Sequence, residues 1–203
     1  MSDYDAHNDP AIKNMMDLLD FADRSENTKK AYLTYTTPFV IYCHDVLHKS
    51  PDKVNHAEIR QFLTFIQEDR KLQNRTVNHA ISELKYLLVS SGFEWDDLQV
   101  PHKSFSSPVL YVPTEDEVLA LIDSIDDTKK RAMVALMYDT GIRVSELCKL
   151  KCQDVYTKKL YIHIEDGKGR YSRDVPICER TVELLTKYWE ELPKSMKTRD
   201  WLF

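Results

Sequence analysis

Three of the four glycines in this chain lie in one short stretch, beside two basic residues. Gly141 lies just before Arg143, and Lys168 stands between Gly167 and Gly169. Glycine permits positive φ and a close approach of the backbone to a ligand, so these positions favour a binding site. A guanidinium binds two phosphate oxygens at once, and a lysine can donate a proton to a leaving alkoxide. These residues therefore predict chemistry on phosphate.

Arg143 and Glu146 have a spacing that places both side chains on one face of a helix beginning near Arg143. The amide groups at such a helix start favour anions, and the Glu146 carboxylate could hold the guanidinium in one orientation. The alternative is an ordinary surface pair, which stabilises a helix by only about 0.2–0.5 kcal/mol. Lys168 likewise has an alternative as a polar turn residue. No G-x-x-x-x-G-K-[ST] sequence is present, which disfavours a nucleotide triphosphatase.

Basic residues are distributed unevenly along a chain whose overall charge is negative. The 203 residues carry a formal net charge of −5, but residues 129–180 contain 12 Lys and Arg against 7 Asp and Glu. Phosphates are met by local patches, so a basic segment on an acidic chain is compatible with a nucleic-acid partner. The alternative is a solvated face with uneven charge.

Composition also limits the class and the compartment of the protein. With 42% hydrophobic residues, the chain can bury the core of one domain or of two small ones. No stretch is apolar and long enough to span a bilayer, and residues 1–9 lack Lys and Arg. We therefore expect a cytoplasmic protein without a membrane partner. The four cysteines are scattered, which favours reduced thiols over a disulfide framework.

Hydrophobic periodicity predicts that residues 1–95 are helical and that residues 96–113, with three prolines and little periodicity, form a linker. The expected helices run from about Ala11 to Ala22, along the stripe Tyr32, Tyr35, Phe39, Tyr42 and Val46, from Asn55 to Asp69 and from Asn74 to Ser91. The tyrosines of the stripe are interpreted as core rather than as a platform for stacked bases.

Residues 114–203 predict a mixed α and β unit. A T-x-x-E capping box at Thr114 begins a helix, and the apolar run from Ala132 to Tyr138 predicts a buried central helix. The helix that begins at Thr114 is expected to bury Val118, Leu121, Ile122 and Ile125. The other expected elements are strands Leu160–Ile164 and Tyr171–Ile177 and a final helix with Val182, Leu185, Trp189 and Leu192 inward. The predicted fold class is mainly α with a small antiparallel β-hairpin or sheet.

The segments around Arg143 and Lys168 form a more specific pattern when their order along the chain is considered. An apolar run is followed by T-G-x-R-x-S-E-L at residues 140–147, a predicted strand, G-K-G at 167–169 and R-x-V-P at 173–176. This order resembles the tyrosine recombinase (phage integrase) family over about Ala135 to Ile177. Weaker similarity covers the helical half, where N-T-x-x-x-Y at 27–32 and R-T-V-N at 75–78 look like the SAM-like core-binding domain of that family.

The resemblance implies roles for individual residues. Arg143 would be the first catalytic arginine on the scissile phosphate, Glu146 its structural support, and Lys168 the general acid toward the 5′ oxygen. A tyrosine would attack the phosphate and form a covalent phosphotyrosine, so that neither ATP nor a metal cofactor is needed. The resemblance further implies DNA-binding residues in both halves, namely Lys29, Arg75, Thr76, Asn78, Arg170 and Arg173.

The same resemblance implies the domain order and the partners. Residues 1–95 would be a SAM-like core-binding domain, 96–113 a linker, and 114–203 the N-terminal portion of an α+β catalytic domain. The implied partner is double-stranded DNA, held in a C-shaped clamp, together with other recombinase protomers on that DNA.

The chain departs from the family pattern after Lys168. No histidine follows that residue, so the H-x-x-R sequence and the nucleophilic tyrosine of the family are missing. Tyr171, in the expected return strand, and Tyr188, in the last helix, are interpreted as packing residues. We therefore expect a C-terminally truncated catalytic domain that holds the first half of an active site and is inactive alone.

Other interpretations stay open at this point. The chain could be a non-catalytic DNA-binding regulator or remnant that competes for recombination sites, or a helical protein–protein module. His44 and His48 have helical spacing for a metal, but no third ligand is evident, and we expect no metal site. Cys148 and Cys152 lack a second pair and are interpreted as buried thiols.

Overall fold

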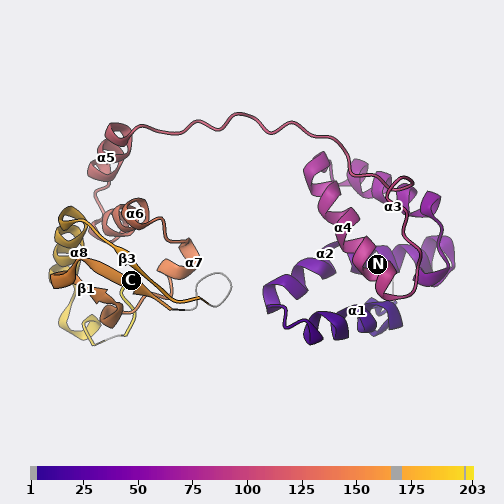
Figure 1. Cartoon of the computed structure of the whole chain (residues 1–203), viewed down its shortest axis with the longest axis horizontal. Coiled ribbons are helices and arrows are strands. Elements are labelled where there is room, and N and C mark those ends of the chain that lie inside the picture. The colour runs from indigo at the N-terminus through magenta and orange to yellow at the C-terminus, as the bar shows by residue number, and fades with distance from the viewer. Residues whose placement is uncertain (1–3, 166–170, 199) are drawn as a thin grey trace. The chain divides into compact units, whose positions relative to one another are not determined.

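Helices build the N-terminal unit of the chain, Met1–Val109, and a smaller α and β unit follows at Leu110–Phe203 (Figure 1). The structure, a computed structural model, describes residues 4–165, 171–198 and 200–203. The helices of the N-terminal unit are α1 (Pro10–Phe21), α2 (Glu26–Tyr42), α3 (His56–Asp69) and α4 (Asn74–Ser90), with a π-helical turn at Cys43–Leu47 and 3-10 turns at Ala6–Asn8 and Pro51–Lys53. Within the described ranges, no helix has the length and hydropathy that crossing a membrane requires.

Short polar side chains cap α1, α2 and α3, whereas α4 begins without a side-chain cap. The Asp9 carboxylate accepts the amide of Ala11 at 2.8 Å, at the start of α1. Ser25 caps α2, and Asn55 and Glu58 form a reciprocal capping box at α3. Because these caps satisfy amide groups that have no partner inside the helix, the predicted helices begin within a few residues of their expected positions.

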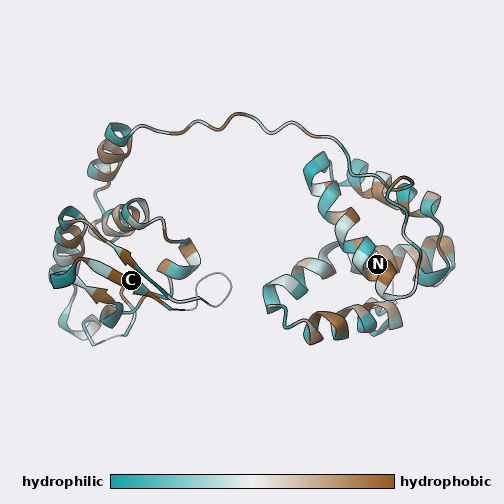
Figure 2. Cartoon of the chain, in the orientation of Figure 1, coloured by the Kyte–Doolittle hydropathy of each residue, from teal (hydrophilic) through white to brown (hydrophobic). Residues whose placement is uncertain are grey.

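Aromatic residues of α2 and α3 meet in the core of the N-terminal unit. The rings of Phe39 and Phe62 lie edge to face with centroids 5.1 Å apart, and both residues are fully buried. Figure 2 shows that hydrophobic and hydrophilic residues alternate along each helix, as expected for helices with one buried face. The prediction for Val46 is wrong: this residue lies in the π-helical turn, and 57% of its surface is exposed.

The first part of the expected linker is held by the N-terminal unit. Val100 is 2% exposed and belongs to the core of that unit. The Asn78 side chain donates to the carbonyl of Lys103 at 2.8 Å and accepts the Lys103 amide at 2.7 Å. Beyond it, Val109 to Val112 form an exposed apolar run in the extended segment that joins the units (Figure 2).

The C-terminal unit is built from helices around a three-stranded antiparallel sheet of order β1-β2-β3. Its elements are α5 (Glu115–Ser124), α6 (Thr128–Thr140), α7 (Val144–Leu147), β1 (Val155–Tyr156), β2 (Tyr161–Ile164), β3 (Arg173–Pro176) and α8 (Glu179–Glu191), with 3-10 turns at Cys152–Asp154, Thr157–Lys159 and Lys194–Met196. The predicted fold class, mainly α with a small antiparallel sheet, is confirmed. The two-residue strand β1 was not expected, because so short an element leaves no alternation to recognise.

The core of the C-terminal unit lies between α6, α8 and the buried face of β2. Leu136 and Ile162 are fully buried there, and Tyr188 of α8 is 3% exposed and stacks on Phe203 with ring centroids 5.4 Å apart. The interpretation of Tyr188 as a packing residue is confirmed. The chain end is fixed to the same unit, because the Leu202 amide donates to the carbonyl of Leu150 at 2.9 Å.

Several expectations about the C-terminal unit are corrected. Leu121 and Tyr138 are 57% and 48% exposed, so α5 and α6 bury a narrower face than their apolar residues suggest. Leu160 has a φ of +54° and precedes the strand that it was expected to begin. Tyr171 precedes β3 and is 77% exposed, so it is not a packing residue. Cys148 is exposed rather than buried.

The half-buried Glu83 carboxyl of α4 predicts a pH-dependent stability of the N-terminal unit. Burial raises the pKa of Glu83 to about 7, although its carboxylate accepts the Tyr35 amide at 3.1 Å. The folded unit thus favours the neutral acid, and the cost of ionisation grows as the pH rises from about 4.5 to about 7. Glu83→Gln keeps the acceptor and should be more stable than the native protein by about 1–2 kcal/mol near pH 8.

Urea unfolding of the N-terminal unit, followed through the amide signals of α2 and α4, measures this difference. The exposed Glu68 on α3 provides the matched control, Glu68→Gln. A Glu83→Gln variant whose advantage is the same at pH 4 and pH 8 would contradict the assignment.

Candidate functional site

Gly141 turns the chain from α6 into the short helix that carries the candidate phosphate residues. Gly141 has a φ of +62°, and its amide donates to the carbonyl of Met137 at 2.9 Å, which ends α6. A side chain at this φ would strain the backbone, so glycine is the suitable residue. Ile142 is buried, and Arg143 then lies at the start of α7 with its side chain 55% exposed.

The Glu146 carboxylate accepts four hydrogen bonds from two arginines. Its Oε1 accepts Nη1 of Arg143 at 2.9 Å and Nη1 of Arg173 at 3.2 Å. Its Oε2 accepts the backbone amide of Arg143 at 2.9 Å and Nη2 of Arg173 at 2.8 Å. These four donors match the acceptor capacity of a carboxylate, so Glu146 is fully engaged by its neighbours. We call these residues the Arg143–Glu146–Arg173 cluster.

The environment of Glu146 keeps its carboxylate charged. The side chain is only 6% exposed, and the hydrogen bonds from Arg173 and then from Arg143 lower its pKa to about 2 despite the cost of burial. The same contact raises the pKa of Arg173. With one carboxylate between two guanidinium groups, the cluster carries a net positive charge and can receive an anion.

Arg173 reaches Glu146 from the buried face of the sheet. In the β2–β3 register, Arg173 lies opposite Ile164 and Val175 lies opposite Ile162. Directly opposed residues share one face, and both isoleucines are in the core. The sequence placed Arg173 among the DNA-binding residues, whereas the structure directs its guanidinium to Glu146. The alternation of Arg173 with Val175 in the expected strand indicated that the two side chains share a face, but it did not indicate which residue Arg173 contacts.

Two of the predicted site residues cannot be placed in this arrangement. Lys168 and Arg170 lie outside the described residues, so the expected convergence of Lys168 with Arg143 remains a prediction. The described residue that precedes this gap is Glu165, whose carboxylate lies 3.5 Å from the Lys151 ammonium.

The predicted DNA-binding residues of the N-terminal unit differ in their surroundings. Lys29 contacts the Asp20 carboxylate at 2.6 Å and also Glu26, and only 13% of its side chain is exposed. Asn78 holds the backbone of Lys103 through both groups of its amide. Arg75 is exposed at the start of α4, and Thr76 is half-buried beside it. Of these residues, Arg75 is therefore the best placed to meet an anion.

A hollow of about 610 Å³ lies beside Arg75, between α4 and residues 102–105. Its basic side chains are Arg75, His79, His102 and Lys103, and none of the described residues that line it is Asp or Glu. Of these, His79, His102 and Lys103 were not among the predicted site residues, because two of them lie in the expected linker. We call this feature the Arg75 hollow.

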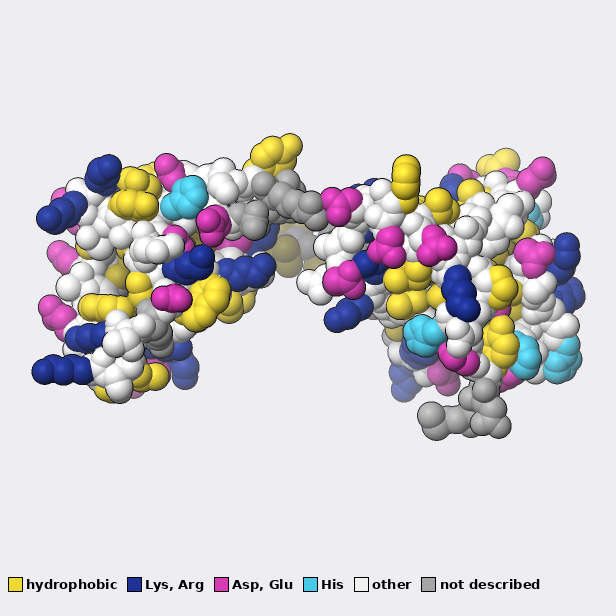
Figure 3. Space-filling view, turned by 90° about the horizontal axis from the view of Figure 1, so that it is seen from below, with side chains coloured by type: hydrophobic (Ala, Val, Ile, Leu, Met, Phe, Trp, Pro, Cys, Tyr) yellow, Lys and Arg dark blue, Asp and Glu magenta, His cyan; other side chains and the backbone are white. Residues whose placement is uncertain are grey.

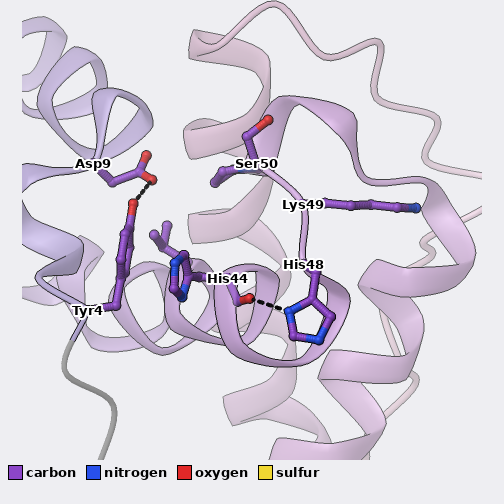
Figure 4. Close-up of a pocket in the computed structure, with 8 residues that line it drawn as sticks. Tyr4, Asp9, His44, His48, Lys49 and Ser50 are labelled. Atoms are coloured by element: carbon purple, nitrogen blue, oxygen red, sulfur yellow. Dashed lines mark hydrogen bonds between the residues drawn. The ribbon is translucent and has the colours of Figure 1, made fainter.

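A second hollow, beside the π-helical turn that follows α2, contains the histidine pair that the sequence suggested for a metal (Figure 4). The ring of His44 stacks on Tyr4 with centroids 4.1 Å apart, and its Nδ1 lies 2.8 Å from a carboxylate oxygen of Asp45. Nδ1 of His48 lies 3.2 Å from the carbonyl oxygen of His44. Among the residues that the structure describes, no three His, Cys, Asp or Glu side chains gather as metal ligands.

Charged side chains of both signs are mixed on the face of the molecule drawn in Figure 3. Lys and Arg lie among Asp and Glu on this face of each unit, with apolar side chains between them. The candidate anion sites described above, the Arg143–Glu146–Arg173 cluster and the Arg75 hollow, are local arrangements of side chains.

Comparison with known proteins follows this division into two units. Residues 112–203 match the family model described as the phage integrase family. Residues 12–90 match the model of the phage integrase N-terminal SAM-like domain. Together these two matches cover most of the chain.

Curated relatives and solved structures agree with these matches. A putative integrase/recombinase of Sinorhizobium fredii is 26% identical over 198 residues, which are 96% of this chain and 61% of the relative. The tyrosine recombinase XerA of Thermococcus kodakarensis is 30% identical over 183 residues, covering 88% of this chain and 61% of the relative. The chain thus spans about three fifths of the length of these two relatives.

A solved structure shares the fold. The Tn1549 transposon integrase, in complex with circular intermediate DNA, superimposes with a TM-score of 0.65 at 17% identity, covering 97% of this chain and 71% of that one. This likeness supports the fold and leaves the function to be argued from the residues.

The buried carboxylate of Glu146 predicts acid sensitivity of the C-terminal unit. Because the folded pKa of about 2 lies below the ordinary value of 4.5, ionised Glu146 stabilises the unit above about pH 5, and this contribution is lost as the pH falls toward 2. Glu146→Gln should lower the free energy of unfolding by about 2–3 kcal/mol at pH 7. The same substitution should also make the free energy of unfolding less dependent on pH below pH 5.

Thermal unfolding at several pH values measures this effect, with Glu183→Gln, on the exposed side of α8, as the control. Equal losses of stability in native and Glu146→Gln proteins between pH 5 and pH 2 would contradict the prediction.

Proposed function

This chain belongs to the tyrosine recombinase (phage integrase) family, and from this premise we propose that it binds duplex DNA for site-specific recombination. In this proposal the C-terminal unit receives the scissile phosphate and the N-terminal unit binds the duplex beside it. The proposed setting is the cytoplasm, on DNA shared with other recombinase protomers. The single observation that carries the proposal is the net positive Arg143–Glu146–Arg173 cluster.

Arg143 is the residue we assign to the scissile phosphate. Glu146 accepts its backbone amide and one of its terminal nitrogens, so the guanidinium has one fixed side and one exposed side. A fixed guanidinium can hold two oxygens of a phosphodiester and stabilise the charge that develops on a pentacoordinate phosphorus. Lys168 stays in the proposal as the general acid toward the 5′ oxygen, and Arg170 as a DNA contact nearby.

The Arg75 hollow is the surface we assign to the DNA backbone in the N-terminal unit. Its basic lining without a described carboxylate suits phosphate oxygens, and Thr76 adds a hydroxyl at the start of α4. Lys29 stays in the proposed interface with a smaller contribution, because Asp20 and Glu26 share its charge. Asn78 would act through the Lys103 backbone that it holds.

Cleavage needs groups that these 203 residues do not contain. The chemistry we propose for the family member is transesterification through a phosphotyrosine, without ATP or a metal cofactor. No H-x-x-R sequence follows Lys168, and Tyr188 is committed to the core. We therefore propose that the 203-residue chain binds DNA but does not cleave it by itself.

A non-catalytic DNA-binding regulator is the second candidate function. The observation that favours it is that the described phosphate-binding groups, the Arg143–Glu146–Arg173 cluster and the Arg75 hollow, suffice for binding without cleavage. Such a protein would compete with a complete recombinase for its sites while using the same phosphate contacts. A protein–protein module is distinguished from both, because its binding would not depend on Arg143.

DNA binding should depend on salt and on the two proposed phosphate contacts. The affinity for duplex DNA should fall as the salt concentration rises, since cation release accompanies each phosphate contact. Arg143→Ala and Arg75→Ala should each weaken binding by about 3- to 10-fold and reduce the slope of log affinity against log salt by about 0.9. Fluorescence anisotropy with labelled duplexes measures both quantities.

Lys13→Ala on α1 and Lys187→Ala on α8 remove the same charge from exposed positions and serve as controls. If affinity is indifferent to ionic strength, or if the controls lose as much as the site variants, the proposed interface is wrong.

A nicked suicide duplex tests whether the chain alone can cleave. We expect no covalent protein–DNA adduct on denaturing gels, because a nucleophilic tyrosine with its H-x-x-R partner is missing from these residues. An adduct that disappears in Tyr171→Phe would identify the exposed Tyr171 as a nucleophile and contradict this expectation.

A further inference from the structure

Arg173 occupies a position where the sheet would ordinarily place an apolar residue. It lies opposite Ile164 at the root of the β2–β3 hairpin, on the face that packs into the core of the C-terminal unit. A guanidinium on a core face is costly unless it finds a charged partner. The two parallel hydrogen bonds to Glu146, at 2.8 and 3.2 Å, provide that partner and join β3 to α7.

This contact changes the charge that Arg143 can offer. If Glu146 had Arg143 as its single partner, the pair would be neutral, and the guanidinium would have little net attraction for a phosphate. Arg173 gives Glu146 two hydrogen bonds from its guanidinium and Arg143 gives it one, so Arg173 provides the larger share of the charge that balances the carboxylate. The surplus charge then resides on Arg143, which is the more exposed of the two arginines, with 55% against 37% of the side chain exposed.

We propose that Arg173 is a positioning residue, which acts through Glu146 to keep Arg143 oriented and positively charged for a DNA phosphate and does not itself contact DNA. This inference rests on the proposed function. It replaces the expectation that Arg173 binds DNA directly, and it gives the R-x-V-P sequence at 173–176 a defined task. The same contact fixes the root of the hairpin to the helix that carries Arg143.

A double-mutant cycle between Arg173→Gln and Glu146→Gln tests the proposal on the whole chain. If Arg173 acts through Glu146, Arg173→Gln should weaken duplex binding by about 3- to 5-fold in the native background, which is no more than the loss expected for Arg143→Ala. In the Glu146→Gln background the same substitution should change affinity by less than about 2-fold, because no carboxylate remains to be balanced. Arg173→Lys keeps the charge but not the fork, and should fall between these values.

Two outcomes would overturn the inference. A loss that persists in the Glu146→Gln background would mean that Arg173 contacts a phosphate directly. An Arg173→Gln variant that is less stable but binds duplex DNA with native affinity, at a temperature where both are folded, would reduce Arg173 to a structural role. Circular dichroism at the binding temperature confirms folding, and Arg173→Lys serves where Arg173→Gln fails to fold.

A measurement without DNA separates this inference from the proposed function. Carbon-detected NMR titration of the Glu146 carboxyl should show its low pKa in the native chain, a rise in Arg173→Lys and a larger rise in Arg173→Gln. The side-chain nitrogen signals of Arg143 should shift in the same variants. If the native chain shows no salt-dependent DNA binding while these shifts occur, the proposed function fails and the coupling stands. If neither signal changes, the coupling itself is wrong.

Discussion

One buried carboxylate organises the C-terminal unit around its candidate site. Glu146 accepts hydrogen bonds from the backbone and side chain of Arg143 and from the side chain of Arg173, so a single group joins α7 to β3. The carboxylate is expensive to bury and is retained only because two guanidinium groups surround it. The surrounding elements bring the two guanidinium groups to this carboxylate. Gly141 turns the chain toward α7, which carries Arg143 and Glu146, and the hairpin register places Arg173 within reach of Glu146. The site is therefore held by charge balance as well as by hydrophobic packing.

Much of this fold could be predicted from the sequence, because helix caps and apolar periodicity are local signals. The T-x-x-E sequence at Thr114 marked a helix start that the structure contains, and apolar spacing placed another start near Asn55. The spacing of Arg143 and Glu146 likewise indicated their contact. The contact of Glu146 with Arg173 spans 27 positions, and only the strand register, which short-range patterns do not define, brings the two together. Leu121 shows that a local signal can also mislead, because this apolar residue was expected to be buried and is 57% exposed.

The N-terminal unit shows how an irregular segment can contribute to a binding surface. Residues 96–105 have the composition of a linker, yet Val100 enters the core and Asn78 fixes the backbone of Lys103. As a result, His102 and Lys103 stand beside Arg75, although 27 or more positions separate them along the chain. Composition describes how a segment behaves in isolation, whereas hydrogen bonds to a neighbouring helix decide whether it becomes part of a surface.

The run from Val109 to Val112 affects how the chain behaves during its synthesis and folding. All four residues are at least 76% exposed, and Val109, Tyr111 and Val112 are of types that are enriched in β-strands. Such a tetrapeptide offers unpaired backbone groups and apolar side chains to any strand edge it meets, including that of a newly made copy. A ribosome releases these residues before α5 to α8 exist. At high expression levels this apolar segment is therefore exposed before the second unit has folded. In that state it is a site for chaperone binding, proteolysis and aggregation.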